Sequence, residues 1–227
     1  MNLPTVVLVT GTDTGVGKTM TTAALAAVLH GKGRSVAVYK PCQSGASNGD
    51  SDTAEVARLA GAVTTETGVM LGEPLAPVAA AAVDGTELPG LAVHAEKVKE
   101  LAERHDHVLV EGAGGLLVAL DSDGGTMADL GSLLKVDAGF VLVVRPALGT
   151  LNHTALTLEA LGVRGQQVVG IVLGSWPIDP EFVHHSNRQV LSSLPVPFLG
   201  SLPENASELS PAAFRSGAAA WLNGLPS

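Results

Sequence analysis

Residues 3–19, LPTVVLVTGTDTGVGKT, decide the fold because they join an apolar strand to a glycine-rich loop and the start of a helix. The run 5–9 is β-branched and uncharged, as expected of a strand that is buried on both faces. Residues 18–31 are rich in Ala and Leu and end at a glycine, which predicts a helix. A glycine turn before a helix N-terminus offers bare N–H groups and a favourable dipole end to an anion. The stretch therefore predicts a phosphate-binding loop.

The loop departs from the standard pattern G-x-x-x-x-G-K-[ST]. That pattern would place its first glycine at Thr12, whereas Gly11 comes one position earlier. In a phosphate-binding loop Lys18 would reach the β- and γ-phosphates, and the Thr19 hydroxyl would bind Mg²⁺. The alternative is an ordinary strand-to-helix turn that happens to carry Gly-Lys-Thr. The order of strand, loop and helix favours a nucleotide site with a variant loop.

The composition suits one α/β domain over residues 1–227. Of the 227 residues 46% are hydrophobic and 15% are charged, which provides material for a sizeable core. The net charge of −9, without a basic run, argues against nucleic acid as a partner. No apolar stretch is long enough for a membrane span, and the N-terminus lacks the features of a signal peptide. A single cysteine, Cys42, cannot form an internal disulfide, which favours a cytoplasmic location.

Strands and helices alternate along the rest of the chain. Together with 5–9, the predicted strands are 35–39, 107–111, 139–144, 167–173 and 196–203. The predicted helices are 18–31, 53–61, 91–104, 149–161, 180–194 and 211–223, and residues 62–90 are expected to be irregular around a short helical stretch at 78–83. This alternation predicts an α/β fold of the P-loop NTPase type, a doubly wound, mainly parallel sheet with helices on both faces.

Polar residues near the predicted strand ends are candidates for the same crevice as Lys18. Lys40 follows the strand 35–39 and is aimed at that crevice, because ligands of open parallel sheets bind at the carboxyl ends of strands. For Lys40 and for Ser44 the alternative is an ordinary surface position. Asp52 could bind Mg²⁺ or could cap the helix that follows it. Glu111 ends an apolar strand, as the acid near magnesium does in P-loop proteins, or it simply begins a loop.

Four stretches together resemble dethiobiotin synthetase: GTDTGVGKT at 11–19, KPCQSG at 40–45, VEGAGG at 110–115 and LGTLNH at 148–153. The resemblance covers almost the whole chain. It implies the ATP-dependent closure of the ureido ring of dethiobiotin from 7,8-diaminopelargonate and CO₂, through a carbamate and a carbamic–phosphoric anhydride. It also implies a homodimer in which each active site takes residues from both subunits.

The resemblance assigns roles residue by residue. Lys18 and Lys40 would be catalytic, and Thr19, Asp52 and Glu111 would bind Mg²⁺. The implied nucleotide-binding residues are Gly15, Val16, Gly17, Lys18, Thr19, Met20, Asp52, Glu111, Gly112, Ala113, Gly114, Gly174, Ser175, Leu202, Pro203 and Glu204. The implied substrate-binding residues are Thr14, Lys40, Ser44, Gly149, Thr150, Leu151 and Asn152, of which the last four would hold the substrate carboxylate across the dimer interface.

The chain departs from the family after the strand 167–173. Many dethiobiotin synthetases carry an Asn-Asp-like pair there, whose amide can bond the adenine edge, but this chain has Gly174 and Ser175. Glycine has no side-chain donor or acceptor, so one source of discrimination between bases is missing. We therefore expect other nucleoside triphosphates to be accepted beside ATP.

Two other functions share part of this sequence pattern. A dimeric ATPase switch of the partitioning or septum-placement type has a similar variant loop, but its signature lysine would align with Asp13. An acid there, together with the lack of a basic patch or a membrane-targeting tail, counts against that function. An amidotransferase-type ligase acting on a larger carboxylate usually belongs to a longer chain with a glutaminase half.

Overall fold

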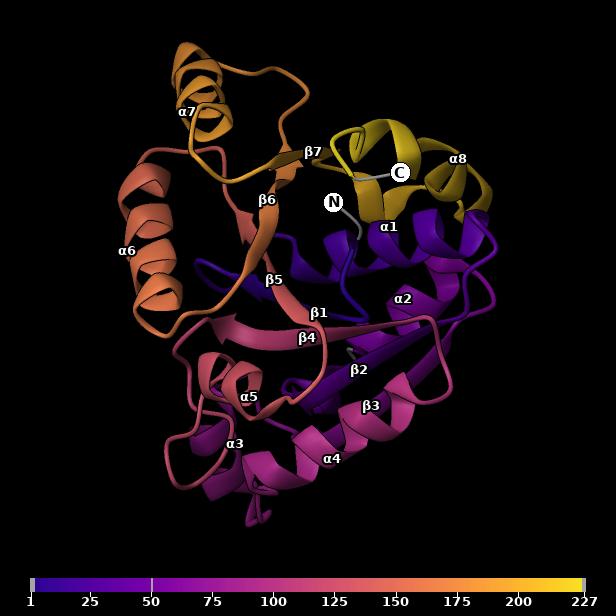
Figure 1. Ribbon diagram of the computed structural model, residues 1–227, viewed down its shortest axis with the longest axis vertical. Helices are drawn as coiled ribbons and strands as arrows, with labels where there is room; N and C mark the ends of the chain where they lie inside the picture. Colours follow the sequence, from indigo (N-terminus) through magenta and orange to yellow (C-terminus); the bar gives the residue numbers. More distant parts are fainter. Residues whose placement is uncertain (1–2, 50, 226–227) are drawn as a thin grey trace.

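Seven strands form one sheet in a computed structural model of the protein, which describes residues 3–49 and 51–225 (Figure 1). The strands lie in the order β3-β2-β4-β1-β5-β6-β7, and every neighbouring pair runs parallel. Their bounds are β1 (Val6–Gly11), β2 (Val36–Gln43), β3 (Thr64–Met70), β4 (His107–Gly115), β5 (Ala138–Val144), β6 (Val168–Trp176) and β7 (Phe198–Pro203). The predicted parallel, doubly wound sheet is confirmed.

Helices cover both faces of the sheet, as predicted (Figure 1). Their bounds are α1 (Lys18–Gly31), α2 (Asp52–Ala60), α3 (Pro77–Asp84), α4 (Leu91–Ala102), α5 (Met127–Leu133), α6 (Thr150–Val163), α7 (Phe182–Ser192) and α8 (Pro211–Trp221). One face carries α1, α2 and α8, and the other carries α3, α4 and α5, with α6 and α7 over β5 and β6. In the described ranges, no helix combines the length and the apolar character needed to cross a membrane.

Strand β1 lies at the centre of the sheet and is buried on both faces. Val7 and Val9 pack into the core beneath α1, and Val6 and Leu8 pack into the core on the opposite face. All four side chains are fully buried, which confirms the prediction from the uncharged β-branched run. Because the strands are parallel, the carboxyl ends of β1, β2 and β4 meet at one edge of the sheet, where ligands of such sheets bind.

Two strands run further than predicted. Strand β2 continues to Gln43 instead of ending at residue 39, and β4 continues to Gly115 instead of ending at residue 111. Lys40 therefore stands inside its strand rather than just after it, and Glu111 stands inside its strand rather than at its end. Their backbones are fixed by the sheet, so their side chains are held more rigidly than side chains on a loop.

The prediction that residues 62–90 are irregular was wrong for residues 64–70. This segment, TTETGVM, is β3, an edge strand that pairs with β2 from Ala37↔Thr64 to Gln43↔Met70. All residues of this strand are half-buried or exposed, so neither of its faces needs to be apolar. The sequence accordingly lacks the alternation of apolar and polar residues that marks a strand with one face in the core. The predicted helical stretch at 78–83 corresponds to α3, which begins with a proline at its first turn.

The start of α2 also differs from one prediction. The N-cap is Ser51, whose hydroxyl accepts a hydrogen bond from the Ala54 N–H, so Asp52 is not the cap but the first helical residue. The Asp52 side chain is therefore available for other contacts. Helix α5 had no counterpart in the prediction, and its N-terminus is closed by a capping box between Thr126 and Asp129.

Candidate active site

The glycine-rich loop joins β1 to α1 in the predicted manner. Gly15 and Gly17 adopt positive φ angles of 71° and 97°, which side chains other than glycine rarely tolerate. Gly17 is the N-cap of α1 and provides no side-chain cap, and the first turn of α1 contains no acid. The loop thus presents backbone N–H groups and a positive dipole end without a competing carboxylate in that turn.

Strand β6 supports this loop through a backbone contact that leaves no room for side chains. A Cβ atom added to Gly174 would lie 2.0 Å from the Val16 carbonyl oxygen, and one added to Gly17 would lie 2.4 Å from the Gly174 oxygen. These distances are far below van der Waals contact. The glycine at position 174 is therefore required by the packing of β6 against the loop.

Lys18 is buried behind the loop. Only 7% of the residue is exposed, and its Nζ donates a hydrogen bond of 3.0 Å to the carbonyl oxygen of Asp13. Burial, followed by the nearby charge of Lys40, lowers the pKa of Lys18 from 10.5 to about 8. The lysine that would contact phosphates thus bonds a carbonyl group of its own loop.

Lys40 stands at the centre of a charged cluster and is 4% exposed, which rules out a surface role. Its Nζ lies 2.5 Å from Asp52 Oδ2 and 2.8 Å from Glu111 Oε1, and it donates to the Gly112 carbonyl at 3.1 Å. Burial alone would lower the pKa of Lys40, but Glu111 and Asp52 raise it above its ordinary value. Burial would likewise raise the pKa of Asp52, and Lys40 holds it below its usual range. Lys40 is therefore a permanent cation here.

Thr19, Asp52 and Glu111 provide the chemistry of a magnesium site. The Thr19 hydroxyl donates to Glu111 Oε1 at 2.9 Å, and both carboxylates contact the same Lys40 ammonium. A hydroxyl and two carboxylates are hard oxygen ligands of the kind that Mg²⁺ takes. Among the described residues no three His, Cys, Asp or Glu side chains gather into a ready-made metal site. The donor set fits a cation that completes its shell with water and phosphate oxygens.

A crevice of about 550 Å³ brings most of the predicted residues together. Lys18, Lys40, Asp52 and Glu111 line it; other predicted residues along its wall are Thr14, Gly15, Gly17, Thr19, Met20, Ser44, Ala113 and Gly114. The buried Ser44 hydroxyl has no hydrogen-bond partner within the described protein and remains available to a ligand.

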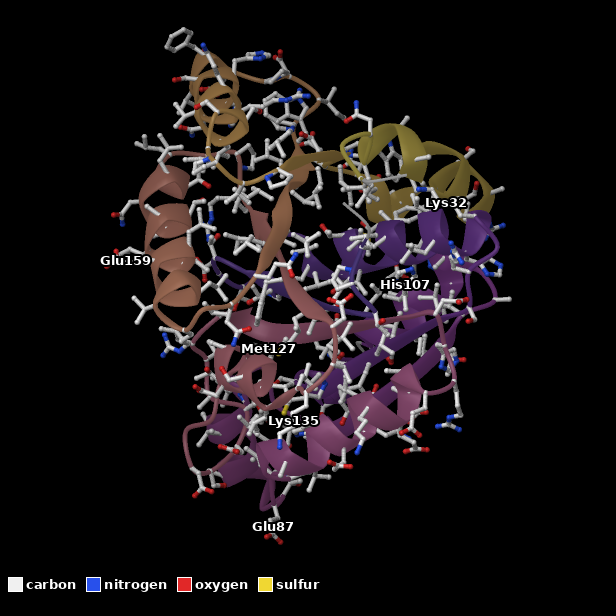
Figure 2. The ribbon with its side chains drawn as sticks, in the orientation of Figure 1. Lys32, Glu87, His107, Met127, Lys135 and Glu159 are labelled. Atoms are coloured by element: carbon white, nitrogen blue, oxygen red, sulfur yellow. The ribbon has the colours of Figure 1, made fainter. Side chains whose placement is uncertain are left out.

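Gly112 has a packing role that the sequence did not indicate. A Cβ atom at Gly112 would lie 2.9 Å from the side chain of Met127, a fully buried core residue of α5 that Figure 2 labels. The glycine therefore makes room for the core, and its carbonyl meets Lys40.

Two predicted groups lie outside the crevice lining. The first comprises Gly149, Thr150, Leu151 and Asn152 at the start of α6, and the second comprises Gly174, Ser175, Leu202, Pro203 and Glu204 at the ends of β6 and β7. In the first group Thr150 is buried, whereas Leu151 and Asn152 face solvent. In the second group Leu202 is fully buried in the core, and the Glu204 N–H bonds the Trp176 carbonyl at 2.9 Å.

Sequence reasoning missed contacts at two polar positions. Arg145, at the end of β5, bonds the Asp13 carboxylate and so ties the loop to the connection that leads into α6. The Thr14 N–H, with help from Arg145, holds the pKa of Asp13 below its usual range. Gln43, inside the KPCQSG stretch, lines the crevice and is 4% exposed. For both residues, the only indication in the sequence was a position in or near one of the four quoted stretches.

Comparison with known proteins places the chain among enzymes. Residues 5–212 match the family described as "AAA domain". An ATP-dependent dethiobiotin synthetase of Mycobacterium avium is 50% identical over 93% of this chain and 92% of that protein. A protein of the same name from Streptomyces coelicolor is 47% identical over 96% of this chain and 91% of that protein.

Solved structures share the fold at low identity. The septum site-determining protein MinD of Pyrococcus horikoshii, solved with Mg-ADP, superposes with a TM-score of 0.58 at 19% identity, covering 100% of this chain and 87% of that one. The cell division protein FtsY of Thermotoga maritima superposes with a TM-score of 0.54 at 17% identity, covering 96% and 69%. At such identities the likeness shows the fold alone.

The depressed pKa of Lys18 predicts a pH-dependent stability. Between pH 8 and 10.5 the folded chain binds fewer protons at Lys18 than the unfolded chain, so the free energy of unfolding rises with pH. Lys18→Met removes this titration. The stability of the variant relative to the parent should therefore fall by about 2 kcal/mol between pH 7 and 9.5, measured by denaturant unfolding without nucleotide. Lys99→Met, at an exposed lysine, supplies the baseline, and a difference that does not change with pH would contradict the burial of the charge.

Proposed function

This chain belongs to the dethiobiotin synthetase family, and on that premise we propose how its crevice carries out the ATP-dependent closure of the dethiobiotin ring. The enzyme is a cyclo-ligase of biotin biosynthesis. The alternative of a septum-placement switch has only fold similarity in its favour. Asp13, bound to Arg145, also stands where such a switch would carry its signature lysine.

The reaction requires electrostatic stabilisation more than a strong base. One amine of 7,8-diaminopelargonate adds to CO₂ and loses a proton, which gives a carbamate. A carbamate oxygen attacks the γ-phosphorus of ATP, ADP leaves, and a carbamic–phosphoric anhydride forms. The second amine attacks the carbamoyl carbon, the ring closes and phosphate leaves. Both phosphorus and carbon centres pass through states with more negative charge on oxygen.

Lys18 and Lys40 supply the positive charge for these steps. The observation that supports this role best is the position of Lys40, a buried ammonium in the same crevice as Lys18 and in contact with Asp52 and Glu111. Lys18 leaves the Asp13 carbonyl for the β- and γ-phosphates, and the N–H groups from Gly15 to Thr19 hold the phosphate oxygens. Lys40 faces the carbamate and the transferred phosphoryl group. Thr14 and Ser44 contact the substrate near the carbamate.

Thr19, Asp52 and Glu111 would hold Mg²⁺ together with the nucleotide. The ion would neutralise charge on the phosphates. The Thr19 hydroxyl, which donates to Glu111 Oε1 at 2.9 Å, would supply its oxygen as a ligand. Lys40 favours the anionic form of the Asp52 carboxylate, whose pKa it holds below the usual range, and it also contacts Glu111 Oε1.

The substrate carboxylate binds at the start of α6 of a second subunit. Helix α6 is apolar and yet open to solvent: Leu151 and Leu156 are 37% and 56% exposed, and Leu148 just before the helix is 85% exposed. Figure 2 shows Glu159 on the same helix directed away from the body of the protein. A helix with an uncovered apolar surface favours a homodimer in which Gly149 to Asn152 meet the partner's crevice.

The base of the nucleotide lies toward the ends of β6 and β7. Gly174 offers it no side-chain group, and its contact with Val16 excludes one. Ser175 and the backbone of Leu202, Pro203 and Glu204 are the remaining contacts, so binding depends mainly on the phosphates. We also propose that residues 1–227 act as one domain in the cytoplasm, where the free, buried Cys42 stays reduced.

Replacing Lys40 tests the catalytic assignment. Lys40→Ala should lower kcat by about 100-fold or more, equivalent to about 3 kcal/mol, because it removes a preorganised charge from the phosphoryl-transfer step. Dethiobiotin formation under saturating substrates is the measurement. Lys97→Ala, which removes a surface lysine paired with Glu66 and Glu100, should leave the rate unchanged. A Lys40→Ala enzyme with nearly the parent rate would refute the role.

Mixed dimers test the shared site. Lys18→Ala and Asn152→Glu should each be inactive alone, because one loses its phosphate contact and the other repels the substrate carboxylate. Co-expressed, they should recover about a quarter of the parent activity, since half of the dimers would have one intact site. Light scattering must show that each variant is dimeric. A fully active monomer at assay concentration would overturn the proposal.

Base selectivity tests the nucleotide site. CTP, GTP and UTP should support the reaction within roughly tenfold to a hundredfold of ATP, because only one or two neutral hydrogen bonds of about 1 kcal/mol each are missing. The comparison of kcat/KM for the four triphosphates measures this. If ATP leads by more than about a thousandfold, another group, such as the Trp176 ring, selects adenine.

A further inference from the structure

Gln43 is the last residue of β2, and both ends of its amide are engaged. Its Oε1 accepts a hydrogen bond of 3.0 Å from the Asp52 N–H, and its Nε2 donates one of 2.8 Å to the Ser44 carbonyl. The residue is 4% exposed. If the amide were rotated by half a turn, its NH₂ group would face the Asp52 N–H and its oxygen would face the Ser44 carbonyl. Both contacts would be unfavourable, so the two partners fix the orientation of the amide. The buried amide thus joins the end of a strand to the start of a helix.

We propose that Gln43 is a positioning residue that holds Asp52 at the Lys40 and magnesium cluster; this inference rests on the proposed function. The Asp52 N–H is one of the first N–H groups of α2, which have no partner within the helix. Ser51 caps a different group, the Ala54 N–H, at 3.2 Å. Gln43 is therefore the contact that anchors the residue that carries the carboxylate.

The anchoring matters because Lys40 and Asp52 reach the cluster from different elements. Lys40 comes from β2, which the sheet fixes, and Asp52 comes from the first turn of α2. The Asp52 side chain is 30% exposed, so packing alone does not immobilise it. A bond from Gln43, three residues after Lys40 on the same strand, sets the distance between the strand and the helix start. Without it, no bond from β2 to the backbone of Asp52 supports the 2.5 Å contact between Lys40 and the Asp52 carboxylate.

In the described part of the chain, the Gln43 side chain bonds the Asp52 N–H and the Ser44 carbonyl and forms no hydrogen bond with Lys40, Thr19 or Glu111. Its effect passes through Asp52. Contacts of this kind that orient a metal ligand typically change metal affinity by about 10- to 100-fold when they are removed. We therefore expect that removal of the Gln43 amide weakens metal binding and does not only lower the stability of α2.

The experiment measures binding of Mn²⁺, a paramagnetic substitute for Mg²⁺, to the full-length protein with a non-hydrolysable ATP analogue, by electron paramagnetic resonance. Five proteins are compared: the parent, Asp52→Asn, Gln43→Met, Gln43→Ala and Ser51→Ala. Gln43→Met keeps the length of the side chain and removes both hydrogen bonds, whereas Ser51→Ala removes the other cap of the same helix. Melting temperatures of all five are recorded, so that a loss of helix stability is seen separately.

Gln43→Met should weaken Mn²⁺ binding about tenfold, and Ser51→Ala should leave it within about twofold of the parent, although both lower the melting temperature. Gln43→Ala, which removes the acceptor for the Asp52 N–H without adding a charge, should likewise weaken Mn²⁺ binding about tenfold, and it decides the question if Gln43→Met does not fold. If Asp52→Asn has no effect, the proposed metal site is wrong. If Asp52→Asn weakens binding but Gln43→Met does not, or if Ser51→Ala weakens it equally, the positioning role is overturned.

Discussion

A single buried ammonium group, that of Lys40, is the constraint on which the site depends. Taking such an ion out of water costs several kcal/mol, which its partners must offset. Those partners come from separate parts of the chain: Asp52 from α2, and Glu111 and the Gly112 carbonyl from β4. The pairing of β2 with β4 brings the strand residues together, but the helix must be brought to them. The charge of Lys40 thus links the architecture of the sheet edge to the chemistry in the crevice.

The sequence predicted the parts of the site that follow from regular patterns. The uncharged run at 5–9 predicted β1, and the order of strand, loop and helix predicted the placement of Lys18. The carboxyl-end rule for parallel strands predicted that Lys40 and Glu111 share a crevice, although the strands extend beyond both residues. Edge strand β3 was not predicted, because its stability comes from backbone pairing with β2 rather than from an apolar face. The role of Gln43 was not predicted, because a side chain that bonds a backbone N–H nine residues away leaves no periodic pattern in the sequence.

The fold alone would have suggested a different protein. The septum site-determining protein superposes over the whole chain at 19% identity, so the two share a frame while most of their side chains differ. In this chain Asp13 accepts from Arg145 and Thr14, so the loop is tied by an acid to the connection before α6. The carboxylate is neutralised by Arg145 instead of opposing the phosphates with a free negative charge. The function of this chain therefore follows from the contacts of individual residues and from its likeness to relatives of high identity, not from topology.

The contact between Gly174 and the phosphate loop restricts how this enzyme can change. The backbone at Gly174 packs directly against the backbone at Val16 and Gly17. A Cβ atom added to Gly174 would lie 2.0 Å from the Val16 oxygen and would overlap it. An asparagine at position 174 could reach a base only after β6 and the loop had separated. A single substitution at this position would therefore damage phosphate binding before it added any hydrogen bond to the base. On the proposed placement of the base, adenine recognition by an amide at position 174 is thus not one mutational step away from this sequence: the spacing between strand and loop would have to evolve first, and an engineer who wished to install it would need to redesign both segments together.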